Sequence, residues 1–437
     1  MIKSEIRNQK SEIKNPKSGI LIRGGRVIDP QNHRDEVLDI LIEDGRITGI
    51  EAKIDNAQAE VIDIKGQHVF PGLVDMHVHL REPGREDEET IASGSRAAAA
   101  GGFTAIACMP NTQPVIDSQG LVQFIRSRQI PECRVYPVGA ITKGSLGEEL
   151  AEIGDMYQSG IVGISDDGKP VTNSNLMRRA LDYCRMFDIP VISHCEDKFL
   201  SADGAMNEGA LATKLGLRGI PNAAEAAMAA RDVMLADLTG GRVHIAHVSC
   251  AETVDIIRRA KRAGIKVTAE TCPQYFILSQ EAVIGYDSMM RVNPPLRSKA
   301  DLMTIIDALK DGTIDCIATD HAPHSSEEKE VEFDQAPCGM LGLETSLGLC
   351  WTHLVEKNIL TASQLVEKMA VNPARILKIE NAIEPKAVAN LTIFDPHAEW
   401  VVDPAKFRSK SRNTPFKGYK LKGRAVMTIV NGHLIKR

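Results

Sequence analysis

The sequence has few of the features that mark specialised protein classes. Aromatic residues make up 4% of its 437 residues, tryptophan occurs twice, and no apolar run approaches the roughly 18 residues of a membrane-spanning helix. The nine cysteines occur singly, without a Cys-x-x-Cys pair or a secreted disulfide pattern. The net charge of −6 offers no basic surface for nucleic acid or an anionic membrane. We therefore expect a cytoplasmic globular protein with free thiols, whose partner is a small molecule rather than nucleic acid or a membrane.

Both ends of the chain carry distinctive local patterns. Residues 1–18 are polar and nearly repeat themselves, which predicts a disordered tail. From Gly19 onward, alternating runs such as GILIRGGRVID are separated by Gly or Asp-Gly, which is typical of hairpins. The C-terminal end repeats this pattern and includes an Asn-Gly turn before its final strand. We predict one small β-sandwich domain built from both chain termini, residues 19–70 and 381–437.

The middle of the chain, residues 71–380, alternates apolar strand-like runs with helical segments. Stretches such as 173–187 and 252–264 carry apolar residues three and four apart, which favours amphipathic helices. Eight runs have the character of parallel strands: LVDMHVH (73–79), FTAIACM (103–109), CRVYPV (133–138), GIVGIS (160–165), IPVISH (189–194), RVHIAHV (242–248), IKVTAET (265–271) and TIDCIATD (313–320). Eight strand–helix units predict an α/β fold of the (β/α)₈ TIM-barrel type. A doubly wound open sheet is the alternative, although no Gly-rich dinucleotide turn follows the first run.

Polar side chains gather at the ends of these runs. The first run ends in His77-Val78-His79, and residues two apart on a strand project to the same face, so both imidazoles can reach one metal ion. Candidates at the ends of other runs are Asp166-Asp167, His194, His247 and Asp320. Each alone has an ordinary explanation as a turn, a helix cap or a core histidine, and His244 is expected to lie in the core. Together, at the C-terminal mouth of a barrel, they offer the ligands that divalent zinc prefers.

Several motifs resemble those of a known enzyme family. HVHLREPG (77–84), MPNT (109–112), RVNPPLR (291–297) and DHAPH (320–324) occur in order through the predicted barrel. In this combination they resemble the dihydroorotases of the amidohydrolase superfamily, of the bacterial type close to the dihydroorotase domain of the large multifunctional pyrimidine enzyme. The resemblance implies a zinc-dependent hydrolase that catalyses the reversible cyclisation of N-carbamoyl-L-aspartate to L-dihydroorotate plus water, the third step of de novo pyrimidine biosynthesis.

The resemblance also implies a site with two zinc ions. The ligands that it implies are His77, His79 and Asp320 for one ion, His194 and His247 for the second, and Asp167 as a bridge between them. Periodicity alone leaves Asp166 and Asp167 open as the bridge. Most two-metal amidohydrolases use a carboxylated lysine there, and Lys143 and Lys169 are the alternatives of that kind. The implied mechanism is attack on the ring amide by a metal-bound hydroxide, with Asp320 as general acid and base.

Substrate recognition requires cationic and amide donors, because both reactants carry carboxylates. Arg81 lies two residues beyond His79 on the same face and can form a bidentate contact with a carboxylate. The other substrate contacts that the resemblance implies are His79, Asn111 and His324, together with Asn293 and the backbone of Cys338 and Gly339 at the pyrimidine ring. The charge-rich stretch Ser325–Gln335 predicts a mobile lid, with a plain solvated loop as the alternative.

Two other kinds of protein share part of this pattern. Allantoinases and dihydropyrimidinases share the His-x-His motif and much of the barrel, but Arg81 combined with DHAPH, without an obvious bridging lysine, argues against them. A rival of another class is a non-catalytic homologue that serves as a structural partner of aspartate transcarbamoylase, but none of the matching positions is lost. We expect a homo-oligomer, such as a dimer, and association with the transcarbamoylase is compatible with activity.

Overall fold

The computed structural model describes residues 19–436, and the predicted tail 1–18 lies outside the described residues. Seven of the eight predicted runs form strands: β6 (Leu73–Val78), β7 (Phe103–Cys108), β8 (Arg134–Pro137), β9 (Val191–Ser193), β12 (Val243–Ile245), β13 (Val267–Thr271) and β14 (Cys316–Ile317). The run at 160–165 contributes a single paired residue, Ile164, which bridges Gly139 on one side and Val191 on the other.

These segments close into a parallel ring. The strands pair in the orders β6-β7-β8 and β9-β12-β13-β14, and Ile164 joins the two groups. On the open side, Val78 forms a parallel bridge with His321, and the amide of His79 donates to the His321 carbonyl at 2.8 Å. The predicted (β/α)₈ barrel is therefore confirmed, and its C-terminal strand ends meet at one mouth.

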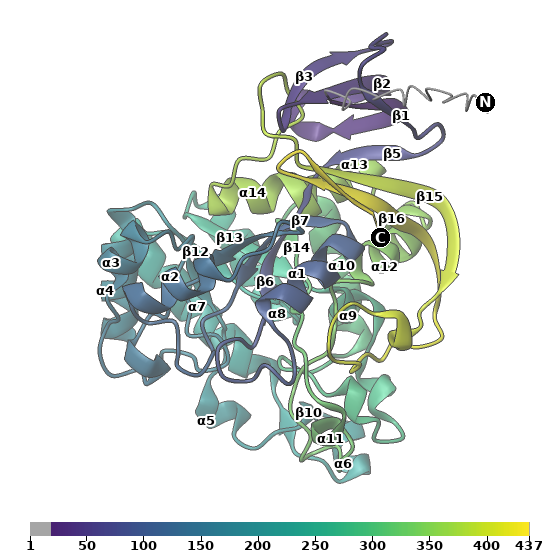
Figure 1. Ribbon diagram of the computed structural model, residues 1–437. Coiled ribbons are helices and arrows are strands. Elements are labelled where there is room, and N and C mark those ends of the chain that lie inside the picture. Colours follow the sequence, from purple (N-terminus) through teal and green to yellow (C-terminus); the bar gives the residue numbers. More distant parts are fainter. Residues whose placement is uncertain (1–18, 437) are drawn as a thin grey trace, which may run out of the picture.

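Helices cover the outside of the ring (Figure 1). Their bounds are α1 (Ile91–Gly101), α2 (Gln119–Ser127), α3 (Ile153–Gln158), α4 (Ser174–Arg185), α5 (Lys198–Ser201), α6 (Ala210–Leu215), α7 (Asn222–Thr239), α8 (Ala251–Arg262), α9 (Pro273–Ile277), α10 (Lys299–Asp311), α11 (Ser326–Lys329), α12 (Ser346–Cys350), α13 (Ala362–Val366) and α14 (Asn372–Leu377). The predicted helical stretches correspond to α4 and α8. In α8, Val254, Ile257 and Ala260 recur every three residues and are buried, as an amphipathic helix requires.

Strands from both ends of the chain form one further sheet. They are β1 (Ile20–Asp29), β2 (Arg34–Glu43), β3 (Arg46–Glu51), β4 (Glu60–Asp63), β5 (His68–Pro71), β15 (Leu391–Val401), β16 (Lys420–Val430) and β17 (His433–Lys436). The order is β17-β16-β15-β5-β1-β2-β3, with β4 beside β1, so the predicted β-domain from both termini is confirmed. A separate short pair, β10 (Met206–Asn207) and β11 (Gly219–Ile220), lies near the barrel mouth. The boundaries 19–70, 71–380 and 381–437 remain our proposal for the division of the chain.

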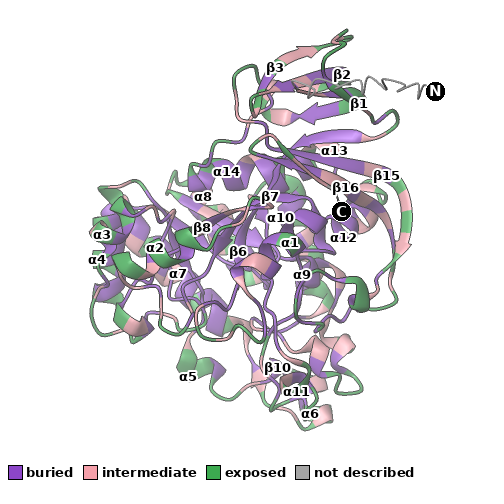
Figure 2. Cartoon of the chain, viewed as in Figure 1, coloured by how far each residue is buried: buried purple, intermediate pink, exposed green. Residues whose placement is uncertain are grey.

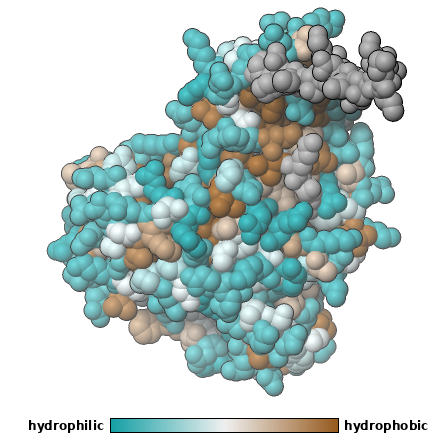
Figure 3. All heavy atoms as spheres, in the orientation of Figure 1, coloured by the Kyte–Doolittle hydropathy of each residue, from teal (hydrophilic) through white to brown (hydrophobic). Residues whose placement is uncertain are grey.

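The barrel and the β-domain share a packed interface. Figure 2 shows buried residues along the barrel strands and exposed ones mainly on the outer helices and loops. Buried aromatic rings join the two parts: Phe394 of β15, which packs on Phe70 of the same sheet at 5.4 Å, lies 4.6 Å from Trp351 of the barrel between ring centroids. Hydrophobic surface gathers where the sheet meets the barrel (Figure 3). Within residues 19–436, no helix combines the length and apolar character needed to cross a membrane.

Candidate active site

The sequence-predicted metal ligands converge at the C-terminal mouth of the barrel. They lie in β6 or within three residues of the C-terminal end of a barrel segment, Ile164 in the case of Asp167: His77, His79, Asp167, His194, His247 and Asp320, all buried. Two of them have left-handed backbones, His247 with φ 34° and Asp320 with φ 49°, and Arg81 beside them has φ 62°. Such conformations cost about 1–3 kcal/mol each in non-glycine residues, and they tend to occur where a side chain must be aimed at a functional site.

Asp167 lies at the centre of this cluster. Its Oδ1 lies 3.4 Å from His77 Nε2, 3.5 Å from His194 Nδ1 and 3.6 Å from His247 Nε2. Its Oδ2 lies 3.6 Å from His79 Nε2. Burial alone would raise the pKa of Asp167, but the charge of His77 and the close polar contacts with the surrounding imidazoles hold it well below its usual value. One carboxylate therefore faces four imidazoles, and it belongs to both groups of side chains that could hold a metal ion.

The donor set fits divalent metal ions. His77 Nδ1 contacts Glu270, whereas its buried Nε2 forms no hydrogen bond although Asp167 and Asp320 lie 3.4 and 3.7 Å away. A buried imidazole nitrogen that faces two carboxylates without bonding either is suited to bind a cation between them. The atoms of His77, His79 and Asp167 lie within 4.8 Å of one another, as do those of Asp167, His194 and His247. The site thus offers two overlapping groups of metal ligands.

Neighbouring carboxylates orient the imidazoles of the cluster. Glu270 of β13 lies 2.8 Å from His77 Nδ1 and 3.3 Å from His244 Nε2. Burial would raise the pKa of Glu270, but hydrogen bonds with His244 and His77 lower it to about 2. Glu196 lies 3.0 Å from His194 Nε2. Neither glutamate was singled out from the sequence, because only the folded barrel places them against the predicted ligands.

The structure separates the alternatives that periodicity left open for the bridge. Asp166 points away from the histidines and accepts hydrogen bonds from the backbone of Ile141 and Thr142. Lys143 and Lys169 are exposed, and Lys143 pairs with Glu149 at 3.3 Å. Asp167 alone among these candidates lies in the histidine cluster.

The predicted substrate residues line the same cavity, which has a volume of about 240 Å³. Its walls include His79, Arg81, Asn111, Asp167, His194, His247, Asn293, Asp320, His324, Cys338 and Gly339. Asn111 Oδ1 lies 2.9 Å from His79 Nδ1, and the Asn293 side chain donates to Glu196 at 3.0 Å. The amide of Gly339 donates to the Arg291 carbonyl at 2.9 Å, so within the chain it is already paired.

Gly339 itself is required by close packing. Its φ is +139°, and a Cβ there would lie 2.6 Å from Ala322 Cβ and 3.2 Å from His324 Nε2. Residues of the β-domain contribute to this wall. The Asn413 side chain, between β15 and β16, donates to the carbonyls of Ala322 and Gly339 and accepts from the amide of His324. Sequence reasoning missed Asn413, since no local motif marks a distant loop that folds back onto the mouth.

A buried ionic network holds Arg81 in place. Its Nε donates to the Pro323 carbonyl at 3.0 Å and lies 3.0 Å from Glu88. Arg85 pairs with both Glu88 and Glu328, the latter at 2.7 Å. Burial and the nearby Glu328 raise the pKa of Glu88 to about 8. The other edge of the Arg81 guanidinium faces the cavity, where Nη2 lies 3.3 Å from His324 Nε2.

His324 stays neutral in this setting. Burial and the positive charge of Arg81 lower the pKa of its imidazole to about 3. Its Nε2 lies 3.0 Å from the Cys338 carbonyl, and its Nδ1 lies 3.2 Å from Glu328. Arg81 therefore brings a positive charge to the cavity, and His324 brings a neutral hydrogen-bonding group.

The predicted lid, Ser325–Gln335, contains the short helix α11 and two firm attachments. Lys329 is 1% exposed, and its Nζ donates to the carbonyls of Ser288 and Pro337 at 3.0 and 2.8 Å. Phe333 is buried in a small cluster with Met206 and Val283. A plain solvated loop would not bury a lysine and a phenylalanine, so the segment is packed against its neighbours, and its movement as a lid stays a prediction.

Sequence comparisons identify relatives over nearly the full chain. A family model described as dihydro-orotase-like matches residues 66–253. A dihydroorotase of Pelotomaculum thermopropionicum is 56% identical over 418 residues, which are 95% of this chain and 98% of that protein. A dihydroorotase of Acetivibrio thermocellus is 52% identical over 96% of this chain and 99% of its own.

Structural comparisons agree with the fold. The L-hydantoinase (dihydropyrimidinase) of Arthrobacter aurescens is similar with a TM-score of 0.86 and 26% identity, over 96% of each chain. A dihydropyrimidinase of Brevibacillus agri gives a TM-score of 0.84 over 96% of this chain and 95% of its own, and at 22% identity it shows the fold alone. The full-length identity to curated relatives establishes the family: the chain belongs to the dihydroorotases, hydrolases with an amidohydrolase-type barrel.

Proposed function

We propose that the protein is a zinc-dependent dihydroorotase that interconverts L-dihydroorotate and N-carbamoyl-L-aspartate, in de novo pyrimidine biosynthesis. The observation that carries the proposal is that one cavity is lined both by the His–Asp cluster and by Arg81. Hydrolysis of a cyclic amide needs a metal-binding cluster of this kind, and recognition of a substrate carboxylate needs a cation such as Arg81. The relatives named dihydroorotase support the same assignment.

The metal site follows from the donor geometry. The residues that would hold zinc are His77, His79 and Asp320 for one ion, His194 and His247 for a second, and Asp167 between them. When bound, two zinc ions lower the pKa of water toward neutrality and polarise an amide carbonyl. The unpartnered Nε2 of His77 and the central position of Asp167 support this assignment.

Asp320 is the proposed proton carrier. In the hydrolytic direction, water adds to the ring amide carbon and the ring carbon–nitrogen bond breaks, which leaves a new carboxyl group and a ureido NH₂. One proton of the water passes through Asp320 to the departing nitrogen, and the new carboxylic acid loses the other to solvent. Burial would raise the pKa of Asp320, but hydrogen bonding to His79 and the charge of His77 hold it below its usual value. Asp320 is therefore ionised and ready to accept the proton.

The remaining cavity residues position the substrate. Arg81 would bind its carboxylate through the guanidinium edge that faces the cavity, beside neutral His324. Asn293 and the backbone at Cys338 and Gly339 would contact the ring. These contacts would present the ring amide to the His–Asp cluster.

The test combines metal analysis with turnover by the purified full-length protein. We expect one to two zinc equivalents and turnover of L-dihydroorotate and N-carbamoyl-L-aspartate, followed by the ultraviolet absorbance of the ring. Allantoin, hydantoin and dihydrouracil serve as comparison substrates. Zinc without turnover of any of them would favour a structural partner of aspartate transcarbamoylase, and preference for hydantoin or allantoin would refute the substrate assignment.

Glu270→Gln tests how the metal site is held. The change removes the buried negative charge that orients His77, and we expect zinc affinity to fall about 10- to 100-fold. The measurement is zinc retention against a competing chelator. Glu252→Gln, on the exposed start of α8, is the matched control and should retain zinc like the wild type. Equal retention by Glu270→Gln would contradict this orienting role.

Lys329→Met tests the attachment of the lid segment. Methionine keeps an unbranched side chain but removes the ammonium group. The Pro337 carbonyl then loses its donor and the Ser288 carbonyl keeps only the Arg291 amide, which costs about 1–3 kcal/mol. We expect faster amide hydrogen exchange across 325–337 and a KM for L-dihydroorotate about tenfold higher, with kcat little changed. Lys310→Met, at an exposed position of α10, is the control. Unchanged exchange would show that Lys329 does not hold the segment.

Location and assembly are also proposed. The nine cysteines form no disulfide and eight of them are buried, which supports a reducing cytoplasm. We propose a homo-oligomer, such as a dimer, that can also associate with aspartate transcarbamoylase. Light scattering of the protein with and without the transcarbamoylase distinguishes these assemblies.

A further inference from the structure

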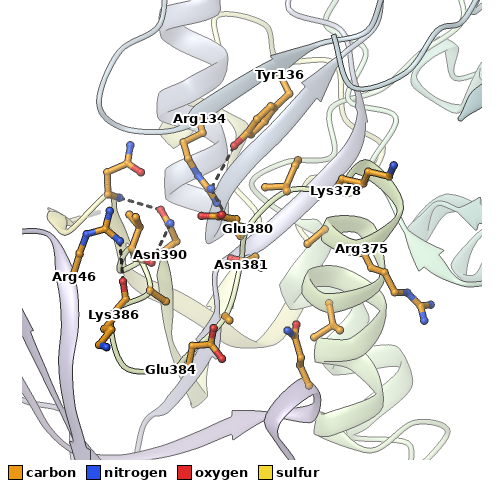
Figure 4. A pocket seen from close by; sticks show the side chains of 18 of the residues that line it. Arg46, Arg134, Tyr136, Arg375, Lys378, Glu380, Asn381, Glu384, Lys386 and Asn390 are labelled. Carbon is orange, nitrogen blue, oxygen red and sulfur yellow. Dashed lines mark hydrogen bonds between the residues drawn. The ribbon is translucent and has the colours of Figure 1, made fainter. Parts of the chain in front are cut away.

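A second, larger cleft lies at the opposite end of the barrel from the active site. Its volume is about 1170 Å³, and its walls come from β3, the start of β8, α14 and the segment 378–390 that leads to β15 (Figure 4). Arg134 is the first residue of β8, whereas the catalytic cavity lies beyond the last residues of the barrel strands. The cleft therefore belongs to the junction of barrel and β-domain, and none of the roles proposed above uses it.

The cleft is rich in positive charge. Five cationic side chains and two carboxylates line it, which gives a local excess of three positive charges in a chain of net charge −6. The cations are Arg46, Arg134, Arg375, Lys378 and Lys386, and the carboxylates are Glu380 and Glu384. Lys378 pairs with Asp188. Within residues 19–436, the other four cations take part in no ion pair, so their charge is available to a ligand.

Two buried polar atoms in the walls have no hydrogen-bond partner within residues 19–436. Arg134 donates to the carbonyls of Thr104 and Glu380 at 3.3 and 3.2 Å, but its Nη2 is buried without a hydrogen bond. Asn381 is 8% exposed, and its Oδ1 is also buried and unpartnered. Unsatisfied groups of this kind are rare in folded proteins. Figure 4 shows Arg134, Glu380 and Asn381 close together on one wall.

A second guanidinium, that of Arg46, lies on another wall of the cleft. Arg46 Nη1 donates to the Lys386 carbonyl at 2.8 Å, which fixes the side chain. Its other side-chain N–H groups make no hydrogen bond to the part of the chain that the structure describes. Tyr136 adds an aromatic surface, with its ring centroid 6.0 Å from the Arg134 guanidinium carbon, and Ile379 adds an apolar one. Cations combined with an aromatic ring and amides suit an organic anion better than an inorganic one.

We propose that this cleft is a binding site for a phosphorylated small molecule of nucleotide size. Arg46, Arg134 and Lys386 would contact the phosphate, and Tyr136 and Ile379 would pack against the organic part. Because the cleft joins barrel and β-domain strands, an occupant would contact both parts of the chain. The proposal is independent of the reaction at the catalytic cavity.

The test is calorimetric titration of the full-length protein with uridine 5′-monophosphate, uridine and inorganic phosphate. The active site is saturated with N-carbamoyl-L-aspartate throughout, so that binding there is excluded. We expect one equivalent of nucleotide to bind, uridine not to bind, and phosphate to bind at least tenfold more weakly. Arg46→Gln and Lys386→Gln should each weaken nucleotide binding about tenfold, because each removes a charged contact.

Controls separate the cleft from general charge effects. Arg259→Gln removes an exposed arginine on α8 and should leave nucleotide binding unchanged. Turnover of L-dihydroorotate should be unaffected by Arg46→Gln, which shows that the variant is folded. Absence of nucleotide binding at millimolar concentration, or binding that survives both cleft substitutions, would overturn the site. Phosphate binding as tight as nucleotide binding would overturn the assignment to an organic anion.

Discussion

Replacing Asp320 with asparagine is expected to lower kcat for both directions of the reaction by about 10³- to 10⁴-fold. Asparagine keeps the size of the side chain and one oxygen near His79, which lies 3.2 Å from Asp320 Oδ1. It cannot accept a proton at any working pH, so the ring nitrogen would lose its proton donor. KM should change little, because Asp320 is not proposed to bind the substrate carboxylate.

The control for Asp320→Asn is the same change at the other end of the same strand. Asp315 precedes β14 and accepts from the amide of Ala269 at 2.8 Å, far from the mouth. Asp315→Asn should keep its catalytic rate. Zinc content is measured for both variants, because Asp320 is also a proposed ligand. Metal-loaded Asp320→Asn with a kcat within tenfold of the wild type would show that another group moves the proton.

Much of the fold could be predicted because the signals were local. Buried parallel strands are short apolar runs, and all eight predicted runs take positions in the barrel ring, although that at 160–165 contributes only Ile164. The residues at the strand ends could be predicted in the same way. His77, His79 and Asp320 lie at or near the ends of apolar runs, and a barrel brings such ends together. Sequence periodicity could not tell which of Asp166 and Asp167 lies among the histidines, because the side chains of adjacent residues in a turn have no fixed direction. That distinction needed either the family resemblance or the structure.

The supporting residues could not be predicted for a physical reason. Glu270 sits within an apolar run and contacts a histidine 193 positions earlier, so its role depends on how two strands align in the ring. Asn413 lies between two strands of the β-domain, yet it hydrogen-bonds the backbone beside His324. A charge-rich sequence indicates an exposed segment, yet Lys329 is buried, because its ammonium group donates hydrogen bonds to the carbonyls of Ser288 and Pro337. These contacts arise from tertiary geometry, which periodicity does not encode.

Arg81 should determine substrate choice. Arg81→Lys keeps the positive charge but replaces the planar fork with a single ammonium group, which cannot bind both oxygens of a carboxylate in one plane. Loss of a charged bidentate contact corresponds to about 2–3 kcal/mol, so KM for L-dihydroorotate is expected to rise about 30- to 150-fold. Zinc content and the rate at saturation should stay close to wild type, because Arg81 touches none of the proposed metal ligands.

Dihydrouracil separates carboxylate recognition from general damage to the site, because it has the same ring without the carboxylate. If Arg81 acts on the carboxylate alone, Arg81→Lys should lower kcat/KM for L-dihydroorotate and leave kcat/KM for dihydrouracil at its wild-type value. The ratio of the two kcat/KM values should then fall by the same factor as kcat/KM for L-dihydroorotate. Arg85→Lys should give a smaller loss, since Arg85 pairs with Glu88, which in turn pairs with Arg81. An equal loss for both substrates would instead mean that Arg81 maintains the shape of the mouth, and carboxylate selectivity would then have to come from His324 and Asn111.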